Sequence, residues 1–537
     1  MRNLVITGFM GTGKSAVGRE VARRLDRPFV DMDARIAARA GKSIRSIFAE
    51  EGEAAFRRME AQLCTELAAR EGLVIATGGG ALVSAENRAR MLAVDTVVCL
   101  RADVATILRR TRDDEGEVRP LLRAADPRAE VARLLAAREE AYAAIPWQIA
   151  TAGKSIAAVA DEVAALAETR TITVRHPGGS YPIHLGRGLR RQLGHALRAA
   201  GLPAGRHIAV VSNPKVAALY RAPIEDALRD AGFSPFACTV PDGEEHKTLG
   251  TVAGLYDQFL EAGLDRSGTV LSLGGGVTGD MAGFAAATYM RGVRFVQAPT
   301  SLLAMVDASV GGKTGVDLPQ GKNLVGVFKQ PALVLIDPEV LTTLDPAEFR
   351  SGMAEVLKHG ILADAALFEA LEQGPPVDEG TLRLELPQLV RALQVKVEVV
   401  EADPFEGGRR ATLNLGHTVG HALERLSNYE LRHGEAVACG LVAAARLAEA
   451  LGRAERGRAE CGLAGRIAAA LANWGLPTTL PPYPIDALLD AMTHDKKKHQ
   501  GRLRWILPRR IGEVEIVEEV PENVVREVLA GAGKENV

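Results

Sequence analysis

Short apolar runs alternate with amphipathic stretches rich in Ala and Arg along the first third of the chain. In the stretches after each run, apolar residues recur every three or four positions, which is the spacing of one helix face. This alternation predicts a parallel sheet covered by helices on both faces. The predicted strands are Leu4 to Thr7, Phe29 to Asp31, Leu73 to Thr77 and Thr96 to Leu100.

The pattern breaks between Ala167 and Tyr181. A predicted helix ends near Glu168, the β-branched run Thr171 to Val174 follows, and His176 to Ser180 has the composition of a turn. We therefore predict a first domain over residues 1–168 and a linker or first-strand region over residues 169–180.

Strand–helix alternation with dense glycine returns from residue 206 to residue 327, and beyond Pro346 the chain is mostly helical and rich in Ala and Leu. We predict an α/β subdomain over residues 171–345 and an α-helical subdomain over residues 346–537, with a cleft between them. The predicted fold class is α/β throughout the first domain and the subdomain that follows it.

Composition narrows the classes of function. A chain of 537 residues with 47% hydrophobic and 25% charged residues is typical of a globular protein with two to four domains. The formal net charge of -2 gives no reason to expect a nucleic-acid or membrane partner. The cysteines form no CxxC pair, the N-terminal apolar run is too short for a signal peptide, and no run could span a bilayer. We expect a soluble, cytoplasmic protein.

A phosphate-binding loop follows the first predicted strand. Residues 8–15, with the sequence GFMGTGKS, match G-x-x-x-x-G-K-[ST] between a strand and a helix. The motif predicts backbone N–H groups around the phosphates of ATP, Lys14 on the transferring phosphoryl group and Ser15 on Mg²⁺. The predicted nucleotide contacts are Gly11, Thr12, Gly13, Lys14 and Ser15.

The chain resembles the shikimate kinase family from Met1 to about Glu168. The resemblance rests on Phe29 to Asp33, Gly41 to Ile44, Ile47-Phe48, Gly52-Glu53, Phe56 to Glu60, Gly78 to Gly80, Arg119 to Leu122, Arg138 and Tyr142. It implies ATP-dependent phosphorylation of shikimate.

Shikimate is a hydroxylated carboxylate, so its pocket needs a cation and a hydrogen-bond acceptor. Arg57 and Arg138 can each bind a carboxylate through two hydrogen bonds, and Gly79 with its neighbouring glycines allows close approach of the backbone. Asp33 can accept a hydrogen bond from a hydroxyl. The resemblance implies that Asp33 orients or deprotonates the attacking hydroxyl and that Asp31 is the carboxylate of the Mg²⁺ site.

A polar, glycine-containing stretch from Asp113 to Glu117 stands just before Arg119. It predicts a mobile lid whose Arg119 closes on the phosphates. With Lys14 and Asp33, Arg119 completes the predicted catalytic set of the first domain.

Two loops of the second part could hold a dinucleotide. Gly274 to Asp280 follows the apolar strand Thr269 to Leu273 with the spacing of a pyrophosphate loop, although it is not G-x-G-x-x-G. Asp242 to Lys247 forms a second loop at a strand end, which alone would be interpreted as a solvated turn.

Several histidines and a glutamate suggest a divalent metal. His417 and His421 share one helix face, His433 follows in His-Gly-Glu, and Glu355 stands upstream. Two or three histidines with a glutamate suit Zn²⁺, or Co²⁺, with a position left open for substrate. Spacing alone favours the pair His417 and His421 and does not fix the ligands.

From about Thr171 to Glu522 the chain resembles the 3-dehydroquinate synthase family. The matching motifs are Thr288 to Gly292, Pro299 to Ala304, Asp307, Gly311 to Gly315, Gly321 to Asn323, Leu413 to His417 and His433 to Val437. The resemblance implies conversion of the seven-carbon keto-acid phosphate DAHP to 3-dehydroquinate. NAD would transiently oxidise a hydroxyl, phosphate would leave, and no net redox change would result.

Residue roles carry over from the same resemblance. The implied metal ligands are Glu355, His417 and His433, whereas His421 lies near the substrate phosphate and Lys358 beside the reacting carbon. The implied NAD contacts are Asn213, Asp242, Glu244, Lys247, Gly275, Gly276, Asp280, Thr300, Ser301, Asp307 and Lys322. The implied substrate contacts are Lys313, Asn323, Lys396, Arg410, Asn414, His421, a lysine of Asp495 to Lys497, and Arg291 from the neighbouring subunit of a homodimer.

Two alternatives stay open. The first joins another small-molecule P-loop kinase to a glycerol-dehydrogenase-like metal and NAD oxidoreductase, but an uncharged polyol would not need Lys313 and Lys396. The second makes the first domain a nucleotide sensor, although a sensor could dispense with Lys14, Asp33 and Arg119. The two implied reactions are not consecutive, so direct channelling is not expected.

Overall fold

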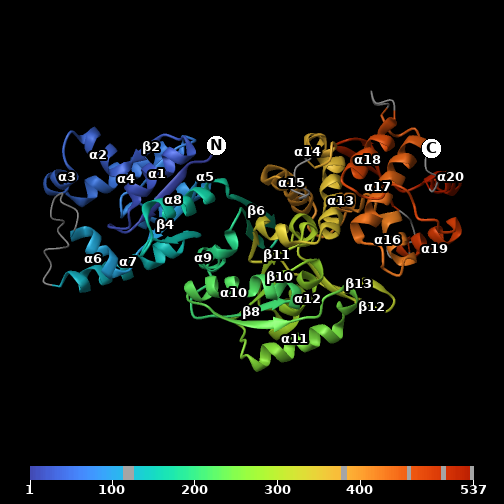
Figure 1. Cartoon of the computed structure of the whole chain (residues 1–537), viewed down its shortest axis with the longest axis horizontal. Coiled ribbons are helices and arrows are strands. Elements are labelled where there is room, and N and C mark those ends of the chain that lie inside the picture. Colours follow the sequence, from blue (N-terminus) through green and yellow to red (C-terminus); the bar gives the residue numbers. More distant parts are fainter. Residues whose placement is uncertain (113–125, 376–383, 456–460, 497–503, 533–537) are drawn as a thin grey trace. The chain divides into compact units, whose positions relative to one another are not determined.

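The computed structural model describes residues 1–112, 126–375, 384–455, 461–496 and 504–532, and Figure 1 labels its elements. The chain forms two units. The first contains Met1–Arg170, Gly186–His207 and Ala222–Pro235, and the second contains Thr171–Leu185, Ile208–Arg221 and Phe236–Val537. The domain boundaries expected from the sequence stay a prediction.

Five parallel strands form the sheet of the first unit, in the order β2-β3-β1-β4-β5. All residues of β1 are buried, as expected for a strand whose sheet is covered on both faces. Four of these strands confirm the sequence prediction, and β5 was not predicted. The strands are β1 (Leu4–Gly8), β2 (Phe29–Asp31), β3 (Val74–Ala76), β4 (Thr96–Arg101) and β5 (Trp147–Ala150).

Capping side chains begin several helices of the first unit. Asp31 accepts a hydrogen bond from the Ala34 N–H at the start of α2, and Ser43 accepts one from the Ser46 N–H at the start of α3. The helices are α1 (Lys14–Leu25), α2 (Met32–Ala40), α3 (Ile44–Glu50), α4 (Gly52–Ala68), α5 (Ala85–Val94), α6 (Val104–Arg112), α7 (Pro127–Ala143) and α8 (Ile156–Ala165).

A second sheet has seven strands in the order β6-β7-β14-β11-β10-β8-β9. The turn predicted around His176 to Ser180 connects β6 and β7, which are neighbours in this sheet. β10 is buried at every position and pairs in parallel with β8 and β11. The strands are β6 (Arg170–His176), β7 (Gly179–Leu185), β8 (His207–Ser212), β9 (Ser234–Thr239), β10 (Thr269–Gly274), β11 (Arg294–Pro299) and β14 (Leu333–Ile336).

The chain beyond Pro346 is mostly helical, as predicted, and Figure 1 shows these helices as a group beside the strands of the second unit. The helices that follow α8 are α9 (Leu193–Ala199), α10 (Pro214–Asp230), α11 (Leu249–Glu261), α12 (Gly276–Thr288), α13 (Pro346–Ala363), α14 (Ala365–Leu371), α15 (Leu386–Ala402), α16 (His417–Leu426), α17 (His433–Ala450), α18 (Gly462–Asn473), α19 (Ile485–Lys496) and α20 (Glu522–Ala532).

Two antiparallel hairpins complete the second unit: β12 (Lys313–Leu318) with β13 (Gly321–Phe328), and β15 (Trp505–Arg510) with β16 (Glu513–Val517). The β15–β16 hairpin was not predicted from the sequence. Pro508 interrupts its apolar run, and the structure accommodates this proline beside a shift in register, where a strand tolerates the missing N–H.

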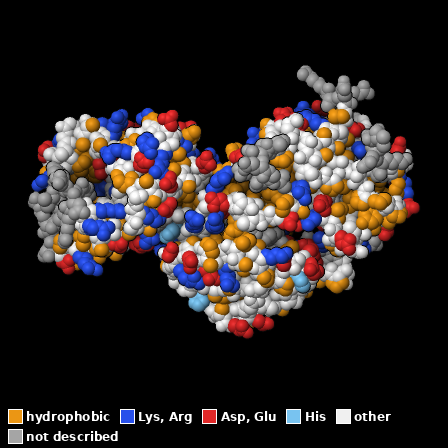
Figure 2. Space-filling view, viewed as in Figure 1, with side chains coloured by type: hydrophobic (Ala, Val, Ile, Leu, Met, Phe, Trp, Pro, Cys, Tyr) orange, Lys and Arg blue, Asp and Glu red, His pale blue; other side chains and the backbone are white. Residues whose placement is uncertain are grey.

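Side chains of both charges are interspersed over the face of the molecule drawn in Figure 2. Among the described residues, no helix combines the length and the apolarity that crossing a membrane requires.

Glycines bring three helices of the second unit unusually close together. A methyl group on Gly440 of α17 would lie 1.9 Å from the Gly416 carbonyl oxygen just before α16. One on Gly434 of α17 would lie 2.0 Å from the Ser351 carbonyl oxygen of α13. Only hydrogen fits at these two positions, so α17 packs with its backbone against both neighbours.

We expect Gly440→Ala to destabilise the second unit, because the Gly416 carbonyl oxygen cannot rotate away from the added methyl group. The expected cost is near the upper end of about 1–3 kcal/mol for overpacking. Thermal unfolding of the metal-free protein measures it. Gly254→Ala in α11 is the control, since no atom lies within 4 Å of its added methyl group. Equal melting temperatures for the two variants would contradict the packing argument.

Candidate functional sites

The GFMGTGKS loop lies between β1 and α1, as predicted. Gly13 precedes α1 with φ of 93° and provides no capping side chain, so the first N–H groups of the helix can receive an anion. Gly8 has φ of 138°, and a methyl group there would lie 2.3 Å from the Leu100 carbonyl oxygen. Glycine is therefore required at both ends of the loop.

Two polar side chains of this loop are held in place. Lys14 Nζ donates to the Phe9 carbonyl oxygen at 3.1 Å, and Ser15 Oγ donates to Asp31 Oδ2 at 2.6 Å. The predicted Mg²⁺ residues are thus direct neighbours, with Ser15 in the first turn of α1 and Asp31 at the end of β2. Their oxygen atoms are the donor type that Mg²⁺ prefers.

The glycines Gly78 to Gly80 lie where the predicted acceptor residues meet. A methyl group on Gly78 would lie 2.7 Å from Asp33 Oδ1, and one on Gly80 would lie 2.6 Å from Arg57 Nη1. Asp33 and Arg57 therefore face the two ends of the same short backbone segment.

Arg138 approaches the same segment from α7. Its Nη1 donates to the Gly79 carbonyl oxygen at 2.9 Å, to which Tyr142 Oη also donates at 3.0 Å. The Arg138 guanidinium also lies over the Phe9 ring, 5.0 Å from its centroid. The structure thus brings Asp33, Arg57 and Arg138 together around the glycines.

Glu60 belongs to this group of residues around the glycines, although the sequence assigned it no role. Its side chain is 1% exposed, and its Oε2 accepts from Arg57 Nη1 at 2.6 Å. Burial raises the pKa of Glu60, which Arg57 opposes. The signal available in the sequence was the three-residue spacing from Arg57 on one helix face. Arg119 and the predicted lid lie outside the described residues.

The predicted dinucleotide residues gather at the carboxyl ends of four adjacent strands of the seven-stranded sheet. Asn213 follows β8, Asp242 lies beyond β9, Gly275 follows β10 and Thr300 follows β11. Asn213 Nδ2 donates to Asp242 Oδ1 at 2.8 Å, and the Thr300 N–H donates to the Gly274 carbonyl at 2.9 Å. This edge of a parallel sheet is where such folds bind nucleotides.

The loop after β10 suits a pyrophosphate. Gly275 precedes α12 without a capping side chain, and Gly276 begins the helix, so the first N–H groups of α12 can receive phosphate oxygens. A methyl group on Gly275 would lie 3.4 Å from Ser301 Oγ. Lys247, nearly buried, contacts Asp280 Oδ2 at 2.7 Å and donates to Asn323 Oδ1 at 2.6 Å.

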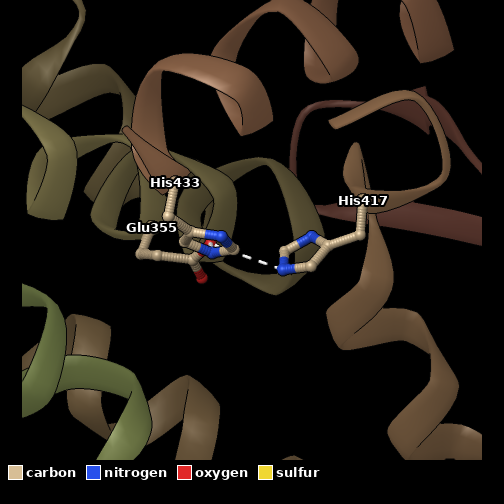
Figure 3. A group of neighbouring side chains, drawn as sticks. All are labelled: Glu355, His417 and His433. Atoms are coloured by element: carbon tan, nitrogen blue, oxygen red, sulfur yellow. Dashed lines mark ion pairs between the residues drawn. The ribbon is translucent and has the colours of Figure 1, made fainter. Parts of the chain in front are cut away.

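Glu355, His417 and His433 converge from α13, α16 and α17 (Figure 3). His433 Nε2 lies 3.5 Å and His417 Nε2 lies 3.8 Å from Glu355 Oε1. One donor atom of each residue lies within 4.8 Å of the other two. The two nitrogens and one oxygen form a donor set that Zn²⁺ accepts.

The ionisation of Glu355 and His417 also suits a metal. Glu355 is 1% exposed, and neither of its oxygens has a hydrogen-bond partner among the described residues, although Lys358 forms an ion pair with it. Burial opposes its ionisation, yet the Lys358 ammonium holds the pKa of Glu355 well below its usual range. Burial likewise holds the pKa of His417 well below its usual range, so its imidazole is neutral, as a ligand requires.

His421 was the better partner of His417 by spacing alone. Its ring lies beside that of His417, with centroids 5.1 Å apart, but it is not among the described donor atoms that converge on Glu355. The tertiary packing of α17 against α16 and α13 brings His433 there instead.

The cations of the predicted substrate set each contact oxygen atoms of other residues. Lys396, buried on α15, forms an ion pair with Asp307, which lies in the π-helical turn η7 (Ala304–Ala308). Arg410 is 1% exposed and donates to the carbonyl oxygens of Pro404 at 2.7 Å and Gly311 at 3.2 Å. Lys313 contacts Glu406 Oε2 at 2.8 Å.

Two other predicted substrate residues lie at the ends of short 3₁₀ segments. Asn414 ends the 3₁₀ segment η9 (Arg409–Asn414), and Arg291 is exposed at the end of η6 (Tyr289–Arg291) with φ of 65°. The side chains of Lys496 and Lys497 lie outside the described residues.

Three residues near this site carried no prediction: His359, Glu406 and Glu424. His359 is fully buried, and neither ring nitrogen has a hydrogen-bond partner among the described residues. Glu406 contacts Lys313, and Glu424 contacts His433 and Lys322. No sequence motif marks these positions, because their contacts come from elements distant in the chain.

Comparison with sequence models of protein families gives three consecutive matches. Residues 10–168 match shikimate kinase, residues 237–351 match the N-terminal part of 3-dehydroquinate synthase and residues 352–498 match its C-terminal part. The 3-dehydroquinate synthase of Nostoc punctiforme is 48% identical over 370 residues, which cover 68% of this chain and 99% of the relative.

Two solved structures extend the comparison. The 2-epi-5-epi-valiolone synthase ValA from Streptomyces hygroscopicus, solved with NAD⁺ and Zn²⁺ bound, is 30% identical with a TM-score of 0.59. The match covers 68% of this chain and 99% of ValA. The shikimate kinase from Acinetobacter baumannii, in complex with shikimate, is 36% identical with a TM-score of 0.29 and covers 31% of this chain and 92% of the kinase.

We expect the purified chain to bind one Co²⁺ ion through Glu355, His417 and His433. His417→Ala should lower the affinity by more than the roughly 100-fold that loss of an outer partner costs, because a direct ligand is lost. Equilibrium dialysis against Co²⁺ measures the affinity. His207→Ala, at an exposed position of β8, is the matched control. Equal affinities for the two variants would exclude His417 as a ligand.

Proposed function

Because the chain belongs to the 3-dehydroquinate synthase family and carries a shikimate kinase domain ahead of it, we propose that it catalyses two reactions of the shikimate pathway. The first transfers a phosphoryl group from ATP to shikimate, giving shikimate 3-phosphate. The second converts DAHP to 3-dehydroquinate with release of phosphate. The observation that carries the proposal is that one chain holds two separate constellations, the glycine-lined acceptor pocket and the Glu355–His417–His433 group, each beside its own phosphate-binding loop.

In the kinase reaction, the chain binds and orients two substrates. The N–H groups at the start of α1 and Lys14 hold the β- and γ-phosphates of ATP, and Ser15 with Asp31 would hold Mg²⁺, which neutralises developing charge when bound. Arg57 and Arg138 bind the shikimate carboxylate. Asp33 accepts the proton of the attacking shikimate hydroxyl group. The hydroxyl oxygen then bonds to the γ-phosphorus, and ADP leaves.

Glu60 supports this arrangement from α4, where it contacts Arg57. Its contact with Arg57 Nη1 fixes the guanidinium beside Gly80, so less rotational freedom is lost when the carboxylate binds. The partial neutralisation of Arg57 by Glu60 also lowers the cost of keeping this cation in a half-buried pocket.

In the synthase reaction, NAD⁺ would lie across the carboxyl ends of β8 to β11, with its pyrophosphate at the start of α12. Glu355, His417 and His433 would hold Zn²⁺ or Co²⁺. When bound, the dinucleotide supplies a transient hydride acceptor and the metal polarises a hydroxyl oxygen.

The protein's own residues bind a phosphorylated keto acid at this place. Lys313, Lys396 and Arg410 supply three cations for the phosphate and the carboxylate, and Asn323 and Asn414 supply amides for hydroxyl groups. Lys358, buried beside Glu355, places an ammonium next to the reacting carbon. His421, beside His417, would contact the phosphate that leaves.

The partners in this proposal are small molecules, and we include a homodimer formed through the synthase half. The exposed position of Arg291 supports the dimer, since a side chain at the surface can reach the site of a second subunit. A cytoplasmic location, as expected from the scattered cysteines, completes the proposal.

Arg57→Ala should abolish most of the shikimate-dependent ADP formation, because the acceptor carboxylate loses a charged hydrogen-bond donor. Such a bond is worth about 1.5–3 kcal/mol, which corresponds to a loss in kcat/KM for shikimate of roughly 10- to 100-fold. Arg58→Ala is the control, since Arg58 is the exposed neighbour on α4. A full-length chain that binds ATP but shows no shikimate-dependent turnover would exclude the kinase assignment.

Lys313→Met should lower kcat/KM for DAHP by roughly 10- to 100-fold, because one cation of the phosphate site is lost. Phosphate release from DAHP in the presence of NAD⁺ and Zn²⁺ measures the effect. Arg57→Ala and Lys313→Met serve as controls for each other, since each should leave the other activity unchanged. An unaltered DAHP reaction in Lys313→Met would remove Lys313 from the site.

A further inference from the structure

Glu424 is a buried carboxylate that neither proposed reaction uses. It lies on α16, its side chain is 5% exposed, and no sequence motif gives it a role. Burying a carboxylate costs free energy unless cations or hydrogen-bond donors compensate its charge. The partners of Glu424 therefore indicate its role.

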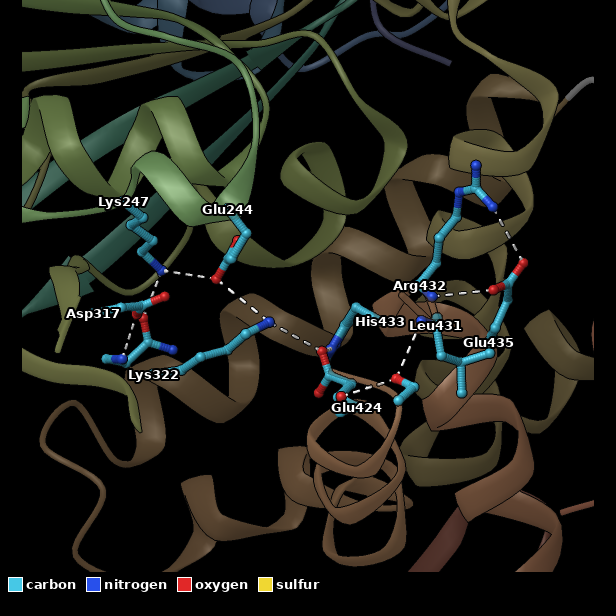
Figure 4. Close-up of polar contacts among 12 residues, drawn as sticks. Glu244, Lys247, Asp317, Lys322, Glu424, Leu431, Arg432, His433 and Glu435 are labelled. Carbon is cyan, nitrogen blue, oxygen red and sulfur yellow. Dashed lines mark hydrogen bonds and ion pairs between the residues drawn. The ribbon is translucent and has the colours of Figure 1, made fainter. Parts of the chain in front are cut away.

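One partner is the metal-ligand candidate His433. Glu424 Oε1 lies 3.5 Å from His433 Nδ1 (Figure 4). Glu355 Oε1 lies 3.5 Å from His433 Nε2 (Figure 3). The imidazole therefore stands between two carboxylates. Glu424 faces Nδ1, so Nε2 is the ring nitrogen directed toward Glu355.

The other partner is Lys322. Its Nζ lies 3.3 Å from Glu424 Oε1 and 3.5 Å from Glu244 Oε1, above the Tyr429 ring at 4.4 Å from the centroid. Lys322 thus supplies the positive charge that compensates Glu424. It also links α16 to the loop that contains Glu244 (Figure 4).

The backbone around Glu424 is fixed as well. Its carbonyl oxygen accepts hydrogen bonds from Ser427 Oγ at 2.9 Å and from the Tyr429 N–H at 2.7 Å. Ser427 Oγ in turn accepts from the Leu431 N–H at 3.2 Å, two residues before His433. The segment that joins α16 to α17 is therefore tied to the residue whose carboxylate faces His433.

We propose that Glu424 is a positioning residue of the metal site, which holds the His433 ring with Nδ1 protonated and Nε2 directed at the cation. The proposal rests on the proposed function only in taking Glu355, His417 and His433 as the ligands. Outer carboxylates of this kind orient a ligating imidazole and raise its basicity, and their loss typically costs 10- to 100-fold in metal affinity.

The test is Co²⁺ binding by the full-length chain. We expect Glu424→Gln to weaken Co²⁺ binding by roughly 10- to 100-fold and to shift the visible absorption bands of the bound ion, because the ligand field of His433 changes. Glu430→Gln, the same substitution at an exposed position six residues away, should bind Co²⁺ like the unaltered chain. Thermal unfolding of the metal-free proteins shows whether each variant is folded.

Glu424→Asp keeps the charge but withdraws the carboxylate by one methylene, and it decides the question if the Gln variant does not fold. A loss of Co²⁺ affinity in a folded Asp variant supports the proposal. Wild-type affinity and an unaltered Co²⁺ spectrum in folded Glu424 variants would overturn it, as would a chain that binds no Co²⁺. A chain that binds Co²⁺ but does not convert DAHP would contradict the proposed function and leave this inference standing.

Discussion

The buried carboxylate of Glu355 is the charge around which the helical part of the second unit is arranged. Lys358 lies one turn further along the same helix, and His417 and His433 face the carboxylate from α16 and α17. A carboxylate in this position would be strongly destabilising without cationic partners. The cost is met by an ion pair and by donors that suit a divalent cation, so the stability of the helices and their capacity to hold a metal have the same origin.

The same constraint explains the ionic pairs around the site. Asp307 with Lys396, and Glu424 with Lys322, are buried or half-buried pairs whose members come from distant segments. Each pair places one cation near a proposed site for an anionic substrate or cofactor and compensates that cation with a carboxylate. A near-neutral chain can therefore concentrate positive charge locally, where phosphates and carboxylates are to be bound.

Both units share one arrangement that is suited to binding phosphate. A strand ends in glycines, a helix begins without a capping side chain, and its first N–H groups stay available: Gly13 before α1 and Gly275 before α12. In each sheet the polar residues lie at the carboxyl ends of parallel strands. Because backbone N–H groups supply contacts to the phosphate in this arrangement, the two loops can differ in sequence.

The sequence predicted what is encoded locally. The P-loop, four strands of the first sheet, the turn between β6 and β7 and the helical character beyond Pro346 each depend on neighbouring residues, and the structure confirms them. Contacts between segments that are distant in the chain were harder to predict from the sequence. The sequence offered both His421 and His433 as metal candidates; spacing favoured His421 as the partner of His417, and the resemblance favoured His433. Glu60 and Glu424 received no role, because burial beside Arg57 and His433 depends on tertiary packing.

The glycines of α17 give the site a vulnerability that does not depend on its ligands. Gly434 and Gly440 supply no ligand atom to the proposed site, yet they allow α17 to approach α13 and the start of α16 closely, where His433 and His417 both face Glu355. Only glycine therefore fits at two positions whose side chains take no part in binding or catalysis. A single methyl group added at either glycine would push α17 away from a neighbouring helix and, with it, displace His433 from the other donor atoms.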